Sequence, residues 1–306
     1  MEGNGHDTVR ASTVFLDHVT KHYRKGGGVD DLTLSVGPGE VFGFLGPNGA
    51  GKTTTIRLIL DLIRPTRGTI SIFGLDSRSE SVAIRRRIGY IPGDVALYDR
   101  LTPREILSHF AHLRGGLAWS AINAQAEELE LEMDRQIRTL SKGNRQKVGL
   151  VAALMGDPEL LLLDEPTSGL DPLVQQQVHE ALRRAVREGR TVFLSSHILS
   201  EVGQVADRVG LIREGRLIAV ERVADLQQRP VHLVDATFRS VPDAAPFEAL
   251  PGVGACKIDG HALHFEVSGS LNPVVATLAA AELTDLSIRE PSLEELFLSF
   301  YEQPRV

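Results

Sequence analysis

The segment GPNGAGKTT at 46–54 has the residue types and the spacing that bind phosphate. It matches G-x-x-x-x-G-K-[ST], in which glycines let successive backbone N–H groups face one anion. The N-terminus of the helix expected after it adds partial positive charge. Lys52 would contact the β- and γ-phosphates, and the Thr53 hydroxyl would bind Mg²⁺; the alternative is a glycine turn before an ordinary helix. The expected phosphate-binding residues are Gly46, Pro47, Asn48, Gly49, Ala50, Gly51, Lys52, Thr53 and Thr54.

A second chemical signal is LLLLDEP at 160–166. An apolar strand that ends in Asp places a carboxylate at the carboxyl edge of a sheet, where open α/β sheets bind ligands. Asp164 would hold Mg²⁺ directly or through water, and Glu165 suits a general base that orients an attacking water. An apolar strand followed by two acids is common by itself. Its pairing with the phosphate loop is what favours function.

A single histidine follows another expected strand, in SSH at 195–197. The chain has ten histidines, and a lone one is more often packed or solvated than functional. His197 is distinguished by its position, one strand beyond the acidic pair. It could contact a γ-phosphate and hold Glu165 and the water in place.

The elements that must position these residues read as an α/β core with an insertion. Strands are expected at 13–19, 32–36 and 41–46, a helix over 53–63, and strands at 69–74 and 191–196. Thr102-Pro103-Arg104-Glu105 is a capping box that starts a largely helical stretch to about Leu154. Two strands joined at Glu214-Gly215 close this part of the chain.

A second, smaller unit is expected after Pro230. Its strand and helix patterns follow the order β-α-β-β-α-β of a ferredoxin-like α+β domain, with a strand pair turning at 259–261. A final amphipathic helix is expected at 291–301.

Composition sets limits on function. The chain has 306 residues, a net charge of −7 and 42% hydrophobic residues, which is ordinary for a globular protein and gives no sign of a basic surface for nucleic acid. Cys256 is the only cysteine, so no internal disulfide is possible. The N-terminus lacks the apolar stretch of a signal peptide, and no run approaches 18 apolar residues. We expect that another chain must cross the membrane if this one serves it.

These motifs, in this order, resemble the nucleotide-binding subunit of an ABC transporter over residues 13–225. GPNGAGKTT is similar to Walker A, LLLLDE to Walker B, SGLD at 168–171 to the D-loop and SSH to the switch-histidine loop. The resemblance implies a P-loop ATPase core with an N-terminal antiparallel β part and an inserted helical subdomain. It also implies that Tyr23 stacks on adenine and that Asp171 lies at the nucleotide. The expected domains are a flexible tail at 1–12, an ATPase domain at 13–228 with a helical subdomain at about 100–155, and an accessory domain at 231–306.

LSKGNRQKV at 140–148 stands where this family has its LSGGQ signature. The segment keeps the groups that would face a phosphate at a helix N-terminus: the Ser141 hydroxyl, the backbone N–H at Gly143 and the Asn144 amide. Lys142 adds positive charge. The resemblance implies that this signature closes over ATP held by another subunit. It implies ATP and Mg²⁺ as cofactors, a head-to-tail homodimer or a heterodimer with a similar subunit, and a separate multi-spanning permease. The protein would then be cytoplasmic and peripheral on the inner face of the membrane.

One departure from the family pattern is Gly93, where the family usually has a Gln that contacts Mg²⁺ and couples to the permease. The two alternatives for Asp94 are that it replaces this Gln as a metal or water ligand, or that it only shapes a turn. Both alternatives are open from the sequence.

Two functions are open as well. The C-terminal extension resembles those of exporter-type subunits for drugs, antibiotics or lipids. The alternative is a soluble ABC ATPase that acts on ribosomes or DNA, although such proteins usually carry two cassettes or long inserted coiled coils. The second unit could bind a regulatory ligand or only stabilise a dimer.

Overall fold

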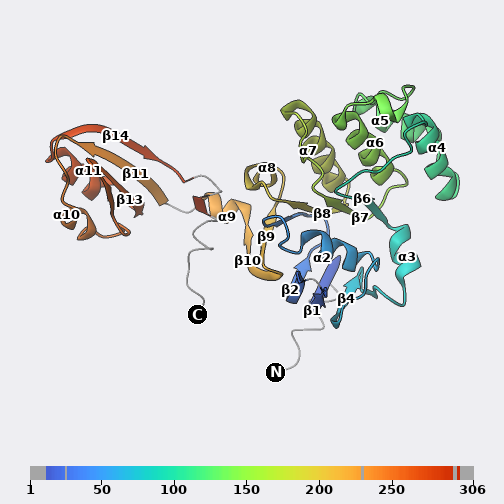
Figure 1. The fold of residues 1–306 in the computed structure, drawn as a ribbon, viewed down its shortest axis with the longest axis horizontal. Helices are drawn as coiled ribbons and strands as arrows, with labels where there is room; N and C mark the ends of the chain where they lie inside the picture. The colour runs from blue at the N-terminus through green and yellow to red at the C-terminus, as the bar shows by residue number, and fades with distance from the viewer. Residues whose placement is uncertain (1–11, 25, 229–230, 292–294, 297–306) are drawn as a thin grey trace. The chain divides into compact units, whose positions relative to one another are not determined.

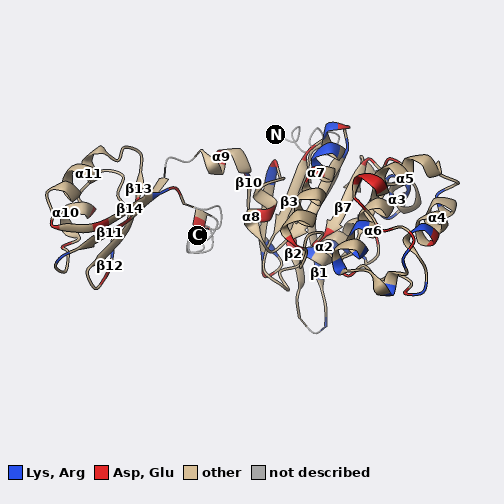
Figure 2. Ribbon diagram, turned by 90° about the horizontal axis from the view of Figure 1, so that it is seen from above, with Lys and Arg blue, Asp and Glu red and all other residues tan. Residues whose placement is uncertain are grey.

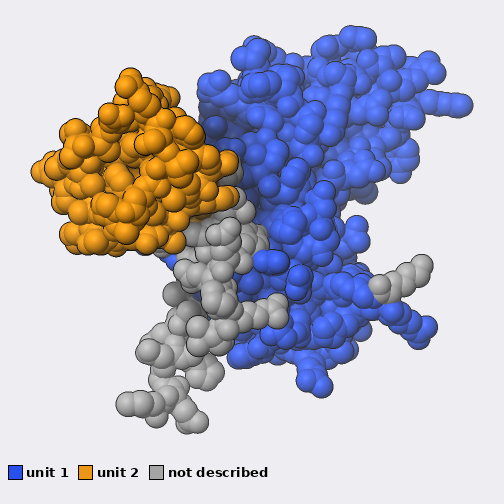
Figure 3. All heavy atoms as spheres, turned by 60° about the vertical axis from the view of Figure 1, so that its left-hand side comes forward, with its two compact units in different colours: residues 1–223 blue, residues 224–306 orange. Residues whose placement is uncertain are grey.

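The computed structural model describes residues 12–24, 26–228, 231–291 and 295–296. The chain forms two compact units, Met1–Val223 and Ala224–Val306, which Figure 3 shows in two colours. The tail expected at 1–12 lies outside the described residues except for Ser12, and the helix expected at 291–301 lies largely outside them.

Unit 1 begins with an antiparallel sheet in the order β2-β1-β4-β5. Every second residue of β1 near its start is buried, as the apolar alternation of its sequence predicts. The predicted strands are confirmed, and β1 and β2 are longer than expected because their hairpin is paired as far as His22 and Gly28. The four strands are β1 (Val14–His22), β2 (Gly28–Val36), β4 (Arg67–Ile72) and β5 (Leu75–Asp76).

The central sheet has six strands in the order β10-β9-β3-β8-β7-β6, and all neighbours are parallel except β9 and β10. Every residue of β3, β7 and β8 is buried, as expected for parallel strands covered on both faces. Phe193 stacks on Phe42 and contacts Phe44, with ring centroids 5.7 and 5.4 Å apart. The strands are β3 (Val41–Leu45), β6 (Ile88–Ile91), β7 (Leu160–Asp164), β8 (Thr191–Ser196), β9 (Arg208–Arg213) and β10 (Arg216–Arg222).

Helix α2 (Lys52–Ile59) packs between the two sheets, since its residues share one buried cluster with residues of both. It is shorter than the predicted helix over 53–63, because Asp61 takes a left-handed backbone conformation with φ 51°. The other helices of the core are α3 (Ser81–Arg86), α7 (Pro172–Arg187) and α8 (Leu199–Gly203).

The stretch from 101 to 154 is helical, as predicted, and lies as a group at one end of unit 1 (Figure 1). Its capping box is confirmed: the Glu105 backbone N–H donates to the Thr102 hydroxyl, and the Thr102 backbone N–H donates to the Glu105 carboxylate. The elements are α4 (Pro103–Leu113), α5 (Trp119–Glu128), the 3₁₀ turn η1 (Ile137–Thr139) and α6 (Lys142–Leu154).

Unit 2 begins within α9 (Val223–Gln227) and has one sheet in the order β12-β13-β11-β14, with all neighbours antiparallel. Helices α10 and α11 and the sheet enclose a separate apolar core around Phe238, Phe247 and Phe265. The elements are β11 (Val231–Phe238), α10 (Ala245–Glu248), β12 (Lys257–Asp259), β13 (Ala262–Ser268), α11 (Asn272–Ala279) and β14 (Leu283–Arg289).

Two surface properties bear on function. Over the part of the chain that the structure describes, no helix has the length and apolarity needed to cross a membrane. Lys and Arg are interspersed with Asp and Glu in both units (Figure 2), as the mixed composition leads one to expect.

Candidate nucleotide site

The phosphate loop connects β3 to α2, as the sequence predicted. Lys52 is the first residue of α2 and its side chain is only 6% exposed. Its ammonium donates to the carbonyls of Gly46, at 2.6 Å, and Pro47, at 3.3 Å. Gly51 has φ 115°, and a Cβ there would lie 2.8 Å from the Gly28 carbonyl, so only glycine fits. The loop therefore curls around the lysine at the N-terminus of a helix.

Backbone bonds from neighbouring strands hold this loop in place. The Gly46 N–H donates to the Ser196 carbonyl at the end of β8, at 3.2 Å. The Gly215 N–H, in the turn between β9 and β10, donates to the Ala50 carbonyl at 2.9 Å. These bonds tie both ends of the loop to the central sheet and leave it little freedom to collapse.

Asp164 ends β7 and is 2% exposed. The parallel register pairs it with Ser195 on β8, whose hydroxyl donates to Asp164 Oδ1 at 2.6 Å. A buried carboxylate with one fixed hydrogen bond keeps its second oxygen available to a ligand. Burial, and then the negative charge of Asp164, raise the pKa of Tyr90 on the adjacent β6.

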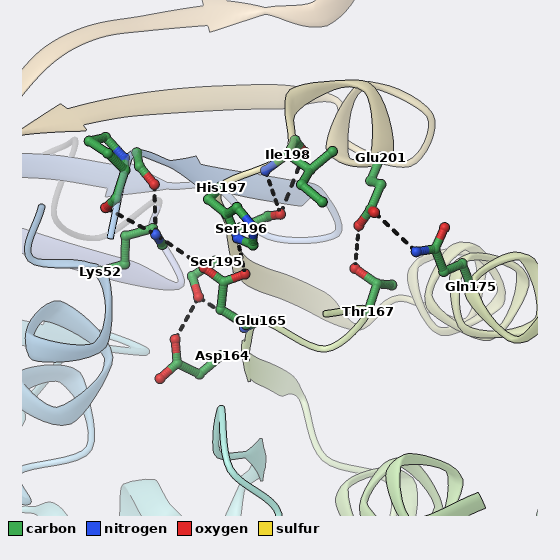
Figure 4. Close-up of polar contacts among 12 residues, drawn as sticks. Lys52, Asp164, Glu165, Thr167, Gln175, Ser195, Ser196, His197, Ile198 and Glu201 are labelled. Carbon is green, nitrogen blue, oxygen red and sulfur yellow. Dashed lines mark hydrogen bonds and ion pairs between the residues drawn. The ribbon is translucent and has the colours of Figure 1, made fainter. Parts of the chain in front are cut away.

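Glu165 is the meeting point of the site (Figure 4). Its Oε1 lies 3.1 Å from Lys52 Nζ, and its Oε2 lies 2.8 Å from His197 Nδ1. Its backbone has φ 51°, a conformation that non-glycine residues rarely adopt, and its N–H donates to both the carbonyl and the hydroxyl of Ser195. The side chain is 18% exposed, against 39% for His197. Once Lys52 releases its oxygen, a carboxylate held by the His197 imidazole is suited to accept a proton from a water.

The structure thus brings together the side chains of Lys52, Glu165 and His197, which are far apart in the sequence. It does not place the signature segment beside them. Ser141 is the N-cap of α6, and its hydroxyl accepts from the Asn144 N–H at 3.2 Å and from the Asn144 amide at 3.4 Å. A Cβ on Gly143 would meet Val174 of α7 at 3.4 Å.

Lys142 of the signature segment reaches the 168–171 loop. A Cβ on Gly169 would lie 2.5 Å from Lys142 Nζ. The signature segment also contacts the preceding residues: Asn144 Oδ1 accepts from the Glu132 N–H, and the Arg145 guanidinium donates to the Ile137 and Arg138 carbonyls.

Two further predicted residues occupy loop and cap positions. Asp171 is the N-cap of α7, with its Oδ1 accepting from the Val174 N–H at 3.1 Å. Tyr23 lies in the β1–β2 hairpin, 39% exposed, and its ring is 5.9 Å from Lys21 Nζ. The same hairpin brings Gly28 against Gly51 of the phosphate loop.

Gly93 lies beside the candidate metal ligand. A Cβ there would be 3.4 Å from Asp164 Oδ2, so a longer side chain at this position would reach that oxygen. Asp94 is exposed, and its backbone carbonyl accepts from the Ala96 N–H at 3.0 Å, which is a turn contact. A metal role for Asp94 stays a prediction.

Four residues of this region were missed from the sequence: Ser195, Thr167, Gln175 and Glu201. Ser195 could have been found from its place two residues before His197 at a strand end. The others share a hydrogen-bond network between α8, α7 and the loop after β7, also shown in Figure 4. Because that network joins three segments, no local pattern marks it.

Comparison with known proteins is consistent with this geometry. The family model described as ABC transporter matches residues 29–168. The chain is 33% identical to the linearmycin resistance ATP-binding protein LnrL of Bacillus subtilis (strain 168), over 92% of this chain and 96% of that protein. It is 35% identical to the daunorubicin resistance ATP-binding protein DrrA3 of Streptomyces coeruleorubidus, over 94% and 95% of the two chains.

A solved structure shares the fold of unit 1. It is the dimeric post-hydrolysis state of the ATP-binding cassette MJ0796 with ADP and Pi. The match has a TM-score of 0.62 and 26% identity, and it covers 69% of this chain and 98% of that one.

Proposed function

From the premise that this chain belongs to the ABC transporter family as an ATP-binding subunit, we propose that it powers export of a drug, antibiotic or lipid through a separate membrane permease. The observation that carries this proposal is the extent of two alignments. LnrL and DrrA3 align over more than nine-tenths of this chain and of themselves, and both are named as resistance ATP-binding proteins. The similarity therefore includes unit 2 as well as the ATPase unit.

ATP would bind with its phosphates in the loop at 46–54. The loop N–H groups and the N-terminus of α2 supply positive potential, and Lys52 supplies a full charge. In the structure the Lys52 ammonium is shared between two loop carbonyls and Glu165. Phosphate oxygens would compete with Glu165 for this ammonium, so nucleotide binding would release the carboxylate to act on water. Tyr23, on the hairpin against Gly51, would stack on the adenine.

Hydrolysis would use Glu165 as the base that orients and deprotonates the attacking water. His197 would keep the carboxylate in position through its Nδ1 contact and would turn its other ring nitrogen toward the γ-phosphate. The ring tautomer that donates from Nδ1 to Glu165 makes Nε2 the acceptor, whereas the protonated ring donates from both nitrogens.

The residues present fit a magnesium ion. Within the described ranges no group of three or more His, Cys, Asp or Glu side chains could hold a metal. Mg²⁺ needs no such cluster, since it is commonly held by one or two carboxylates together with substrate phosphates and water. Asp164 and the Thr53 hydroxyl would supply the protein oxygens. When bound, the ion would neutralise charge on the phosphates.

A second subunit would complete the site. Ser141, Gly143 and Asn144 present a hydroxyl, a backbone N–H and an amide at the N-terminus of α6, and Asp171 caps α7 nearby. We propose a head-to-tail dimer, either of two copies or with a similar subunit, in which these groups close over the partner's ATP. That the similar MJ0796 cassette is dimeric supports the dimer in this proposal.

Unit 2 is proposed to be a ferredoxin-like accessory domain that stabilises the dimer. Its element order β-α-β-β-α-β and its antiparallel sheet order β12-β13-β11-β14 support this assignment. The ATPase domain at 13–228, its helical subdomain at about 100–155 and the peripheral position at the inner membrane face are parts of the same proposal.

The test is a pull-down of the tagged, full-length Glu165→Gln protein from gently solubilised membranes with ATP present. Recovery of a multi-spanning protein in equal amount is the expected result. Recovery of ribosomal proteins, with no membrane protein, would favour a soluble ABC ATPase instead. Export is then tested in vesicles that carry the recovered complex, where accumulation only in the import sense would contradict the proposed direction.

A further inference from the structure

Helix α8 carries a carboxylate that joins two segments following Glu165: the loop after it and the first turns of α7. Glu201 lies one turn after His197, at the middle of α8. Its Oε2 accepts from the Thr167 hydroxyl at 2.6 Å, and its Oε1 accepts from the Gln175 amide at 3.0 Å. Thr167 lies in the connection from Glu165 to α7, and Gln175 lies in the first turns of α7 (Figure 4).

The same amide reaches the end of that connection. Gln175 Nε2 also donates to the Leu170 carbonyl at 3.3 Å, next to Asp171. Both carboxylate oxygens of Glu201 therefore accept hydrogen bonds. One contacts Thr167 near the start of the 165–171 connection, and the other contacts Gln175, which in turn holds the end of that connection. The hydroxyl that it binds belongs to a side chain that is 4% exposed, and Glu201 is itself half-buried. Hydrogen bonds to an ionised acceptor in such surroundings are stronger than neutral ones.

These contacts close a ring through the site. Glu165 contacts His197 at 2.8 Å, α8 follows His197 directly, Glu201 of α8 contacts Thr167, and Thr167 is two residues from Glu165. Helix α8 is fixed on its other side, because Leu199 and Val202 are buried and Val202 packs directly over Gly43 of β3. A displacement of the 165–171 connection is thus transmitted to α8 through Glu201.

We propose that Glu201 is a positioning residue that couples the 168–171 loop to His197. A partner subunit that contacts the loop at Asp171 would, through Leu170, Gln175 and Glu201, set the position of the His197 imidazole against Glu165. Hydrolysis at one site would in this way depend on the state of the other. This inference rests on the proposed roles of Glu165, His197 and the 168–171 loop.

The first experiment measures steady-state ATP hydrolysis by the purified full-length protein. Glu201→Ala is expected to lower kcat by about 10- to 100-fold, the range expected when a catalytic group is misplaced by about 1 Å. KM for ATP should stay within about twofold, since Lys52 and the phosphate loop are untouched. Glu201→Gln should restore most of kcat, because its amide oxygen can accept from Gln175 and its amide nitrogen can donate to the Thr167 hydroxyl, so both contacts are kept.

The matched control is Glu180→Ala, which removes an exposed glutamate of α7 that accepts a hydrogen bond from the Gln176 amide. It should leave kcat and KM unchanged. Thr167→Val provides a variant that removes one contact of Glu201 while keeping side-chain size, in case Glu201→Ala does not fold. Thr167→Val should lower kcat without changing KM. The double variant with Glu201→Ala should lose less kcat than the product of the two single losses.

The outcomes separate the two proposals. If the wild-type protein shows no hydrolysis, or Lys52→Ala hydrolyses as fast as wild type, the proposed function fails. If wild type is active but Glu201→Ala and Thr167→Val keep kcat within twofold, the coupling role is wrong while the ATPase stands. Independent, multiplicative effects of these two substitutions, or a loss in Glu201→Gln equal to that in Glu201→Ala, would overturn the inference as well.

Discussion

Lys52 and Glu165 form an ion pair across the candidate site, with 3.1 Å between Nζ and Oε1. The two side chains are 6% and 18% exposed, so the pair is largely shielded from water. One of them is expected to bind phosphate and the other to activate water, yet here they neutralise each other. The pair holds the base close to the place where the γ-phosphate would lie.

Lys52→Ala should weaken ATP binding by about 100-fold or more. The ammonium would donate charge-assisted hydrogen bonds to phosphate, each contributing about 1.5–3 kcal/mol. Titration of the full-length protein with a fluorescent ATP analogue measures the change in Kd. Lys257→Ala, an exposed lysine of unit 2, is the control and should bind as wild type does. Binding by Lys52→Ala within a few-fold of wild type would contradict the role assigned to the loop.

Glu165→Gln should bind ATP normally and hydrolyse it at least about 100-fold more slowly, because an amide cannot accept the proton from water. With ATP present it should accumulate as a dimer in size-exclusion chromatography. Glu159→Gln serves as the control, because Glu159 lies just before the N-terminal end of β7, away from Glu165, and pairs with Arg87. Near-normal turnover by Glu165→Gln would show that the base is misassigned.

Gly169→Ala should slow hydrolysis, whereas Gly189→Ala should not. Both glycines have positive φ, 68° and 91°, so alanine should cost about 1–2 kcal/mol of stability at either position. Only at Gly169 would the new Cβ meet another residue, Lys142 Nζ at 2.5 Å. The substitution would therefore push the signature lysine away from the 168–171 loop. Denaturant unfolding and kcat measure the two effects, and equal kcat in both variants would argue against a role for the Lys142 contact.

The free energy of unfolding should decrease as pH is lowered, because His179 becomes protonated more readily in the unfolded state. This α7 side chain is 8% exposed, and burial lowers its pKa below the ordinary 6.5, with Glu201 opposing the shift. The folded state then binds fewer protons than the unfolded state, so the free energy of unfolding rises with pH in this window. The contribution is complete above pH 6.5 and is lost as pH falls from there toward the folded-state pKa.

His179→Gln should remove this part of the pH dependence, measured by denaturant unfolding between pH 5 and 7.5, a range chosen to span the ordinary histidine pKa. His109→Gln, at an exposed position on α4, should keep it. A wild-type slope that persists unchanged in His179→Gln would mean that other groups produce it.

Local patterns predicted local structure well. The order of strand, loop and helix from Val41 onward, the capping box at Thr102 and the hairpin at Glu214-Gly215 were predicted and confirmed, although the helix ends at Ile59. Each depends on residues within a few positions of one another, as do the backbone conformations that they specify. Helix α3 and strand β6 were not predicted, because six and four residues are too few for a clear hydrophobic period.

The residues expected to bind phosphate could be named from the sequence by itself, because GPNGAGKTT is one continuous segment whose backbone would do the binding. The meeting of Lys52, Glu165 and His197 was decided by the tertiary structure. These residues follow β3, β7 and β8, which are adjacent only because the sheet order is β3-β8-β7. Parallel neighbours bring their carboxyl ends to one edge of the sheet. The crossovers that connect parallel strands are long, so no fixed spacing in the sequence shows which strand ends will be adjacent. The link from Glu201 to Thr167 has the same origin, since only the packing of α8 against the loop after β7 brings the two together.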